Sequence, residues 1–131
     1  ETQPILMRLK SDLAELCLAA LEGSLDKISA EWDTRHAIGV VLASKGYPGE
    51  YKKDLPISGL DFEPISHTKI FHAGTTLKDN IVVSSGGRVL CVTSIGNTIG
   101  ESYERCYAQV KRVAFKGATF RKDIAWRALQ R

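Results

Sequence analysis

The sequence has 131 residues, of which 44% are hydrophobic and 25% are charged, and its net charge at neutral pH is +3. This composition is typical of a folded domain and excludes disordered and fibrous chains. Its basic residues are scattered rather than clustered, which disfavours a nucleic-acid surface. No apolar run reaches the length of a membrane span and no signal segment leads the chain, so we expect a cytoplasmic protein without membrane contact.

The first predicted element is a helix over about residues 4–21. Pro4 suits the first turn, where its missing N–H needs no partner, and Thr2 and Gln3 are candidate caps. Gly23 supplies the stop. The apolar residues expected to share one face are Ile5, Leu6, Leu9, Leu13, Leu16, Cys17 and Ala20. This face is wide for a terminal element, so we expect it to pack partly on something outside the chain.

The periodicity changes after residue 35. Residues 36–44 form a nearly continuous apolar run, which predicts a strand buried on both faces. Gly46, Pro48 and Gly49 then force an irregular turn. A turn of this kind at the end of a buried strand is a common place for a ligand to meet the backbone.

The middle of the chain predicts further strands. One strand of about six residues ends at Gly74, and residues 80–96 predict two strands joined as a hairpin through Ser85, Gly86 and Gly87. The sheet is therefore expected to have at least four strands.

The clearest predicted helix lies within residues 97–115. Thr98 and Glu101 have the spacing of a capping box, and one apolar stripe follows them. The stripe consists of Ile99, Tyr103, Cys106, Tyr107, Val110 and Val113. A short helix or turn after Gly117 closes the chain. Strands followed by a covering helix indicate an α+β domain.

No complete catalytic constellation is visible in the pattern. His67 and His72 are five residues apart in one predicted strand, so they would point to opposite faces, and His36 is remote. No nucleophile elbow, phosphate loop or dinucleotide fingerprint occurs. The cysteines match no zinc or redox spacing and are interpreted as buried small residues in a reducing compartment. They are Cys17, Cys91 and Cys106.

Three glycine-containing turns remain as candidate binding elements, at residues 44–49, 72–75 and 85–88. Each offers backbone N–H groups that could hold a phosphate or carboxylate. Each also has one polar or cationic neighbour, namely Lys45, Thr75 and Arg88. The alternative is that glycine simply makes the turns.

Five motifs, in order along the whole chain, resemble the C-terminal portion of the phosphoribosylamine–glycine ligase family, an ATP-grasp family. They are ETQPILMRLKSDL, ASKGYPGEY, KIFHAGT, GGRVLCVTSIG and RKDIAWRAL. The resemblance implies a ligase of de novo purine synthesis that joins glycine to 5-phosphoribosylamine through an acyl phosphate. ATP would be the cofactor, with Mg²⁺ or Mn²⁺ on its phosphates, and ADP and phosphate would be released.

The resemblance also implies which residues face the substrate cleft. They are Lys45, Gly46, Tyr47, Pro48, His72, Ala73, Gly74, Thr75, Gly86, Gly87 and Arg88. Arg88 is the best cation for the ribose phosphate. No residue of the chain is assigned a catalytic or metal-ligating role. Lys45 departs from the family, which often has a small residue there.

Glu1 would be the last acidic residue of the family's Gly-Asp-Pro-Glu-x-Gln signature and would adjoin the metal and glycine loop. The metal ligands and the lid over ATP are then expected upstream, in the N-terminal and ATP-grasp domains. The resemblance implies that residues 1–30 are the last helix and connector of the ATP-grasp domain. Residues 31–131 would form the C-terminal domain, mostly antiparallel and barrel-like. We expect the chain alone to bind no cofactor and to lack ligase activity.

The closing motif adds two expectations. Asp123 is interpreted as structural, in an ion pair or cap that fixes the closing segment. Ala125 stands where the family usually has glycine, so its φ is expected to be negative. Two other classes stay open: a non-catalytic binding or assembly domain that uses the apolar face of the first helix, and a basic RNA-binding module.

Overall fold

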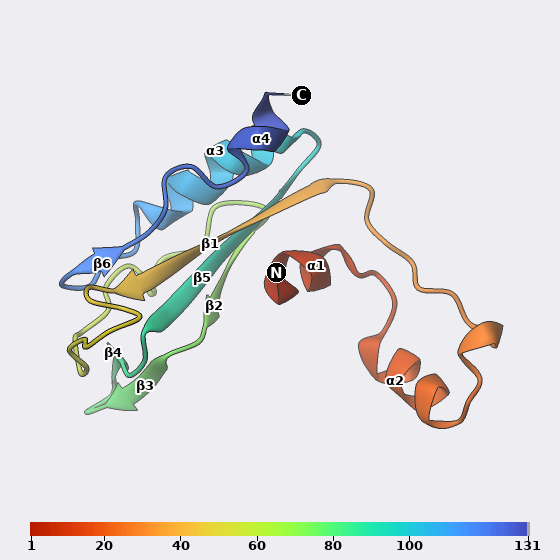
Figure 1. The fold of residues 1–131 in the computed structure, drawn as a ribbon, viewed down its shortest axis with the longest axis horizontal. Coiled ribbons are helices and arrows are strands. Elements are labelled where there is room, and N and C mark those ends of the chain that lie inside the picture. The colour runs from red at the N-terminus through yellow and green to blue at the C-terminus, as the bar shows by residue number, and fades with distance from the viewer. Residues whose placement is uncertain (131) are drawn as a thin grey trace.

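The computed structural model describes residues 1–130 (Figure 1), in which the chain forms helices on two sides of an antiparallel sheet. The helices are α1 (Thr2–Arg8), α2 (Leu13–Leu21), the 3-10 helix η1 (Leu25–Lys27), α3 (Ile99–Val110) and α4 (Trp126–Leu129). The strands are β1 (His36–Ser44), β2 (Thr68–His72), β3 (Thr75–Lys78), β4 (Ile81–Ser84), β5 (Arg88–Gly96) and β6 (Ala118–Thr119). Arg131, the last residue of the expected C-terminal domain, lies outside the described residues. Within residues 1–130, no helix has the length and apolar character needed to cross a membrane.

The larger sheet has four strands in the order β2-β5-β1-β6, and its pairings are antiparallel. Val40 of β1 lies opposite Val92 of β5. A separate two-stranded sheet joins β3 to β4. The predicted α+β fold with mostly antiparallel strands is therefore confirmed. Because β2 and β6 remain as edges, the larger sheet is open, and the expected barrel-like closure is wrong.

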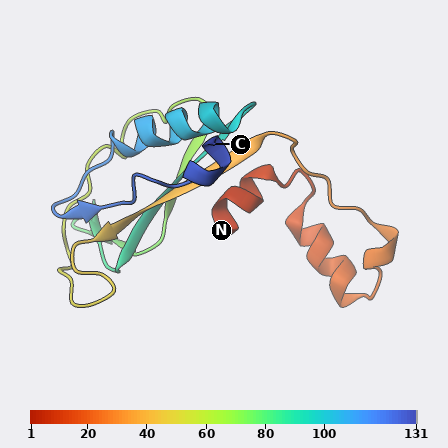
Figure 2. The same ribbon diagram turned by 45° about the horizontal axis from the view of Figure 1, so that its top comes forward.

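The strand buried on both faces is β5 rather than β1. Every β5 residue after Arg88 is buried, whereas buried positions in β1 alternate with half-buried or exposed ones, and Val41 is 40% exposed. β5 is central, with α3 on one face of the sheet and α1 near the other (Figure 2). Pro4 of α1 approaches Gly39, where a Cβ atom would lie 3.2 Å from Pro4 Cδ. The prediction that β1 is buried on both faces is wrong, because α1 covers only part of its second face.

The two strands expected to form a hairpin, β4 and β5, do not pair with each other. β4 pairs instead with β3, through a turn in which Asp79 and Asn80 have positive φ angles of 50° and 60°. Such angles match the tight hairpin turns that suit the twist of paired strands. The N–H groups of Ser85 and Gly86, which connect β4 to β5, both donate to the Gly74 carbonyl. The connection thus leads from the smaller sheet to the larger one, and the predicted hairpin of β4 with β5 is wrong.

The predicted N-terminal helix is interrupted between α1 and α2. Leu9 is extended, with φ of −69° and ψ of 121°. The Lys10 N–H, which has no helical acceptor because of this break, donates instead to the Glu31 carbonyl at 2.9 Å. Asp12 then caps α2, since its carboxylate accepts from the Ala14 N–H at 2.7 Å. Helical periodicity alone did not reveal this break, because the apolar spacing continues through it.

The start of α1 also differs from the prediction. The helix begins at Thr2, and Glu1 occupies the cap position without a side-chain cap bond. Pro4 still lies in the first turn, where its missing N–H costs nothing. At the other end, the Arg8 Nε donates to the Asp33 carbonyl at 3.0 Å and the Asp33 N–H donates to the Arg8 carbonyl at 2.6 Å. These bonds anchor α1 to the segment that leads into β1.

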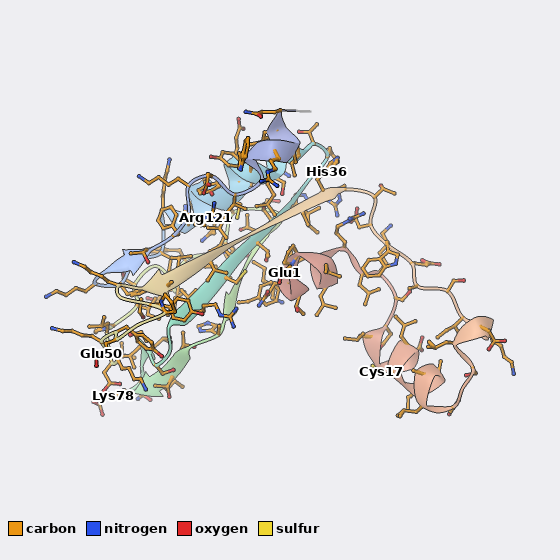
Figure 3. The ribbon with its side chains drawn as sticks, viewed as in Figure 1. Glu1, Cys17, His36, Glu50, Lys78 and Arg121 are labelled. Carbon is orange, nitrogen blue, oxygen red and sulfur yellow. The ribbon has the colours of Figure 1, made fainter. Side chains whose placement is uncertain are left out.

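α2 and η1 extend away from the sheet (Figure 1). α2 ends as predicted at Gly23, whose φ is +67°, and the Ser24 N–H donates back to the Ala19 carbonyl at 2.8 Å. Cys17, which we expected to be buried, is exposed on α2 (Figure 3), because this helix packs little against the rest of the described chain. The exposed large apolar residues of α1, α2 and η1, with the residue after η1, are Ile5, Leu6, Leu13, Leu18, Leu21, Leu25 and Ile28.

α3 confirms the second predicted helix and its apolar stripe. Thr98 Oγ1 accepts from the Glu101 N–H at 3.1 Å. In a capping box the Glu101 carboxylate would accept from the N–H of the cap residue, Thr98. Here it accepts from the N–H of the preceding residue, Asn97, at 2.6 Å. The stripe packs on β1 and β5 to form the core. That core includes Ile38, Val40, Leu42, Leu90, Val92, Cys106, Tyr107, Val110 and Val113.

The C-terminal segment returns across α3. The Tyr107 hydroxyl donates to the Arg121 carbonyl at 2.7 Å and accepts from the Ile124 N–H at 3.2 Å. Arg121 forms a two-bond ion pair with Asp123, with a shortest distance of 2.6 Å, as the structural interpretation of Asp123 predicts. Ala125 has φ of +65° at the cap of α4, so the expected negative φ is wrong. The turn into α4 requires a left-handed residue there, whichever side chain it carries.

Candidate functional site

A cleft of about 650 Å³ lies between the start of α1 and one end of the sheet. Its walls come from α1, from β1 and β5, and from the turns that follow β1 and β2 and precede β5. The lining residues are Glu1, Thr2, Gln3, Val41, Tyr47, Ala73, Gly74, Gly87, Arg88, Leu90 and Cys91. Figure 3 shows Glu1 close to the strands, far from Cys17. This cleft, called the turn cleft below, brings together residues from all three glycine-containing turns.

The three turns are locked together through their backbones. The Gly74 N–H donates to the Arg88 carbonyl at 2.8 Å, and the Ser44 N–H donates to the Gly87 carbonyl at 2.8 Å. A Cβ atom at Gly74 would lie 2.6 Å from the Gly86 Cα, a distance that real side chains do not reach. Glycine is therefore required at this crossing because two backbones touch there. The resulting wall of the cleft is rigid peptide rather than mobile side chain.

Tyr47 forms the adjoining wall. A Cβ atom at Gly87 would overlap the Tyr47 ring, so the ring rests directly on the Gly87 backbone. The Tyr47 N–H donates to the Ser44 carbonyl at 3.1 Å, and the Tyr47–Pro48 peptide bond is cis. Tyr47 is 43% exposed and lines the cleft, as Arg88 does. The lining thus includes both an aromatic and a guanidinium side chain.

Arg88 and Glu1 are the charged side chains among the residues that line the turn cleft. Arg88 is exposed, and within residues 1–130 its guanidinium has no ion pair or side-chain hydrogen bond. Cys91 is buried at the floor, and this burial raises the pKa of its thiol. A thiol with a raised pKa is a weak nucleophile, which agrees with its interpretation as a packing residue. The cleft can bind an anion through Arg88 but offers no activated nucleophile among its lining residues.

The remaining predicted residues lie beside the turn cleft rather than in its wall. His72 Nδ1 and Thr75 Oγ1 are 3.0 Å apart, so these side chains bridge the turn that carries Gly74. Lys45 and Gly46 line a second cavity on the other side of the turn after β1. Pro48 and Gly86 support their turns without lining the cleft.

Sequence reasoning missed five lining residues, two from α1, one from β1 and two from β5. They are Thr2, Gln3, Val41, Leu90 and Cys91. A polar helix start and three small or apolar strand positions carry no local signal of a binding site. Only the packing of α1 across the sheet places them there.

The described residues do not by themselves hold a metal ion. Within residues 1–130, no three His, Cys, Asp or Glu side chains are grouped as metal ligands would be. His67 lies outside β2 with φ of +61°, so it does not share a strand with His72 as predicted. Glu1 supplies one carboxylate to the turn cleft, whereas Mg²⁺ needs several oxygen ligands. These residues therefore do not fit a Mg²⁺ or Mn²⁺ site, and we derive no step through a metal.

The fold and cleft define an α+β domain in which an open antiparallel sheet, covered by one main helix, presents backbone turns to a ligand-sized cleft. Residues 37–127 match the family of the phosphoribosylglycinamide synthetase C domain. The chain belongs to this family.

Curated relatives support the assignment along the entire chain. A phosphoribosylamine–glycine ligase from Escherichia coli is 53% identical over 132 residues, covering 100% of this chain and 31% of the relative. The ligase of the same name from Allochromatium vinosum is 50% identical over 131 residues, with the same shares covered. This chain thus spans about a third of the length of these relatives.

A solved structure agrees with the fold. The crystal structure of phosphoribosylamine–glycine ligase from Thermotoga maritima matches 85% of this chain and 28% of its own chain, with a TM-score of 0.65 and 31% identity. The fold of this chain is therefore similar to that of the matched part of this structure.

Proposed function

We propose that this chain acts as the C-terminal domain of a phosphoribosylamine–glycine ligase. That enzyme would join glycine to 5-phosphoribosylamine with hydrolysis of ATP, in the cytoplasm, during de novo purine synthesis. The match of residues 37–127 to the C-domain family and the identity of 50% or more to ligases support this proposal. ATP and its Mg²⁺ or Mn²⁺ would be held chiefly by the N-terminal and ATP-grasp domains, the protein partners of this domain.

Residues 1–30 are proposed to belong to the ATP-grasp domain, and residues 31–131 to the C-terminal domain. In support, α2 and η1 lie away from the sheet with their apolar side chains exposed. Such a face fits docking on the rest of a ligase as well as it fits an independent assembly role. The exposed face therefore does not by itself favour the non-catalytic alternative.

The turn cleft is proposed to bind the phosphate of 5-phosphoribosylamine. The observation that carries this role is the guanidinium of Arg88, unpaired within residues 1–130 and placed beside three backbone-locked turns. A guanidinium binds phosphate through two parallel N–H bonds, and rigid surroundings lower the entropy lost on binding. Tyr47 would cover the sugar ring from the side. In this role the domain positions one substrate while the chemistry takes place against the other domains.

The test is Arg88→Ala in the complete ligase, assayed for both substrates. Loss of a charged hydrogen-bonding partner worth about 1.5–3 kcal/mol should raise the KM for phosphoribosylamine by about 10- to 100-fold and leave the KM for glycine nearly unchanged. Arg88→Lys should restore part of the affinity, because lysine keeps the positive charge but lacks the planar guanidinium that donates two parallel hydrogen bonds.

Arg112→Ala provides the matched control. Arg112 is exposed and lies outside the lining of the turn cleft, so its removal should leave both KM values unchanged. Equal rises in both KM values for Arg88→Ala, accompanied by a lower unfolding midpoint, would show a structural arginine and overturn the proposed role.

A further inference from the structure

A second cavity, of about 640 Å³, lies on the opposite side of the turn that follows β1. Among the described residues, it shares no lining residue with the turn cleft. Three lysines from separate parts of the sequence, Lys45, Lys52 and Lys116, stand around it, and we call it the lysine cavity. Its volume falls within the range of small-molecule sites.

The charges of the lysine cavity are unbalanced. Glu50 is the acidic residue of its lining, so three lysines and one glutamate leave a charge of +2. Figure 3 labels Glu50 at the end of the sheet where these turns gather. Within residues 1–130, none of the three ammonium groups has an ion-pair partner. Three cations gathered around a single carboxylate repel one another, and a bound anion would relieve this repulsion.

The sheet brings together the backbones that carry two of these lysines, Lys45 and Lys116. Ser44 of β1 lies opposite Ala118 of β6, which brings Lys45 and the residues just before β6 together. A Cβ atom at Gly117 would lie 3.2 Å from the Lys45 Cβ, so the base of the Lys45 side chain rests against that glycine. Because folding already restricts the base of this side chain, less conformational entropy would be lost when the lysine binds an anion.

The remaining surface of the lysine cavity is partly apolar. Tyr51 and Leu55 are half-buried and contribute an aromatic ring and an aliphatic side chain to the lining. The lysine stems add further methylene surface below their charged ends. A ligand that uses the whole cavity would combine an anionic group with an apolar ring.

We propose that the lysine cavity binds a small phosphorylated compound that carries an apolar ring. Its phosphate would lie between the Lys45 and Lys116 ammonium groups, and its ring would lie against Tyr51 and Leu55. The proposal goes beyond the ligase role, because it concerns a separate cavity and stands whether or not Arg88 binds the substrate phosphate.

The test is a titration of the ¹⁵N-labelled 131-residue chain with phenyl phosphate, followed by amide chemical shifts. We expect saturable shifts at Lys45, Lys52 and Gly117, with half-saturation in the millimolar range, below about 10 mM. Inorganic phosphate should bind about fivefold more weakly because it lacks the ring, and phenol should cause no saturable shift at these amides.

Lys45→Ala and Lys116→Ala should each weaken phenyl phosphate binding by about fivefold, the effect of losing one partly exposed ion pair. Lys111→Ala, which removes an exposed lysine outside the cavity, and Arg88→Ala should leave binding unchanged. Preserved shifts elsewhere in the spectrum will show that each variant is folded, and Lys52→Ala replaces any variant that is not.

Absence of saturable shifts at the cavity amides up to about 10 mM phenyl phosphate would overturn the proposal. An equal loss in Lys111→Ala would also overturn it, since binding would then follow overall charge. A loss confined to Arg88→Ala would place the phosphate in the turn cleft instead.

Discussion

The sheet with α3 and the N-terminal segment of residues 1–33 are both rich in apolar side chains, yet they use them in opposite ways. Leu90 of β5 is 0% exposed, whereas Leu18 of α2 is 57% exposed. Within the described chain, α3 has buried residues along its stripe, while α1 has none and α2 has only Ala19. Apolar periodicity therefore predicts a helix in both regions, but the presence of a partner decides whether that helix is buried.

The two regions also differ in what stabilises them within the described chain. The sheet domain rests on a continuous apolar core between α3 and the β1–β5 pair. The N-terminal segment depends on individual hydrogen bonds: the Asp12 cap, the bonds at the Gly23 stop and the two bonds between Arg8 and Asp33, one of which comes from the Arg8 side chain. We expect core substitutions to change global stability strongly and α2 substitutions to act locally.

The largest expected difference is between Leu90→Ala and Leu18→Ala. Leu90→Ala should lower the free energy of unfolding by about 2–5 kcal/mol, because it leaves a cavity in the core. Leu18→Ala should change it by less than about 0.5 kcal/mol, because that side chain already faces solvent. Urea titration of the chain, followed by tyrosine and tryptophan fluorescence and by circular dichroism, measures both. Equal losses would show that α2 is covered in solution and would end the contrast between the regions.

Helix caps give the next largest effect. Thr98→Ala should lower global stability by about 1 kcal/mol, since it removes the cap of the helix that covers the core. Asp12→Ala removes the same type of bond from α2 and should lower helical content without moving the global unfolding midpoint. Amide hydrogen exchange distinguishes local from global opening. A shift of the global midpoint in Asp12→Ala as large as that in Thr98→Ala would contradict local unfolding of α2.

The smallest effect concerns the junction of the two regions. Hydrogen bonds from Arg35, at 2.6 to 3.1 Å, hold the pKa of Asp33 well below its ordinary value of 3.8. The stabilisation is therefore fully present above that ordinary value and is lost as the pH falls through the lower pKa of the folded state. Asp33→Asn should lower the unfolding midpoint near neutral pH, and its difference from the parent chain should shrink in acid.

Arg35→Gln is the partner variant for this junction. It should cause a similar pH-dependent loss, and the double variant should lose little more than either single variant, because both remove one interaction. An additive double variant, or a difference between Asp33→Asn and the parent chain that grows in acid, would show that the Asp33–Arg35 interaction does not stabilise this junction.

Much of the sheet domain was predictable from sequence because its elements have clear local signals. The β1 run, the Thr98 cap and the α3 stripe lie where the patterns place them. The break at Leu9 was not predictable, since its cause is a backbone bond to residue 31, far along the chain. The pairing of β4 with β3 was missed for a similar reason. Which strands pair depends on where the N–H groups of the connecting residues find their acceptors, and the alternation of apolar and polar residues carries no information about this.

The candidate site divides in the same way. The glycine-containing turns of the sequence indicated Gly74, Gly87 and Arg88 as binding residues, and these residues do meet in one cleft. Lys45 was grouped with them from its sequence neighbours, yet the chain turns so sharply after β1 that Lys45 and Tyr47 face different cavities. Adjacent residues in a tight turn can diverge in space, and a motif does not state which way each side chain points.

By itself, the sequence determined the α+β class and the positions of the turns, because residue type and local spacing fix propensity and caps, and five motifs indicated the family by resemblance. Tertiary structure decided which strand is buried on both faces, which turn residues share a cavity and which helices lack cover. These features depend on contacts between segments distant in the chain, where burial and hydrogen bonding are settled only once all partners are in place.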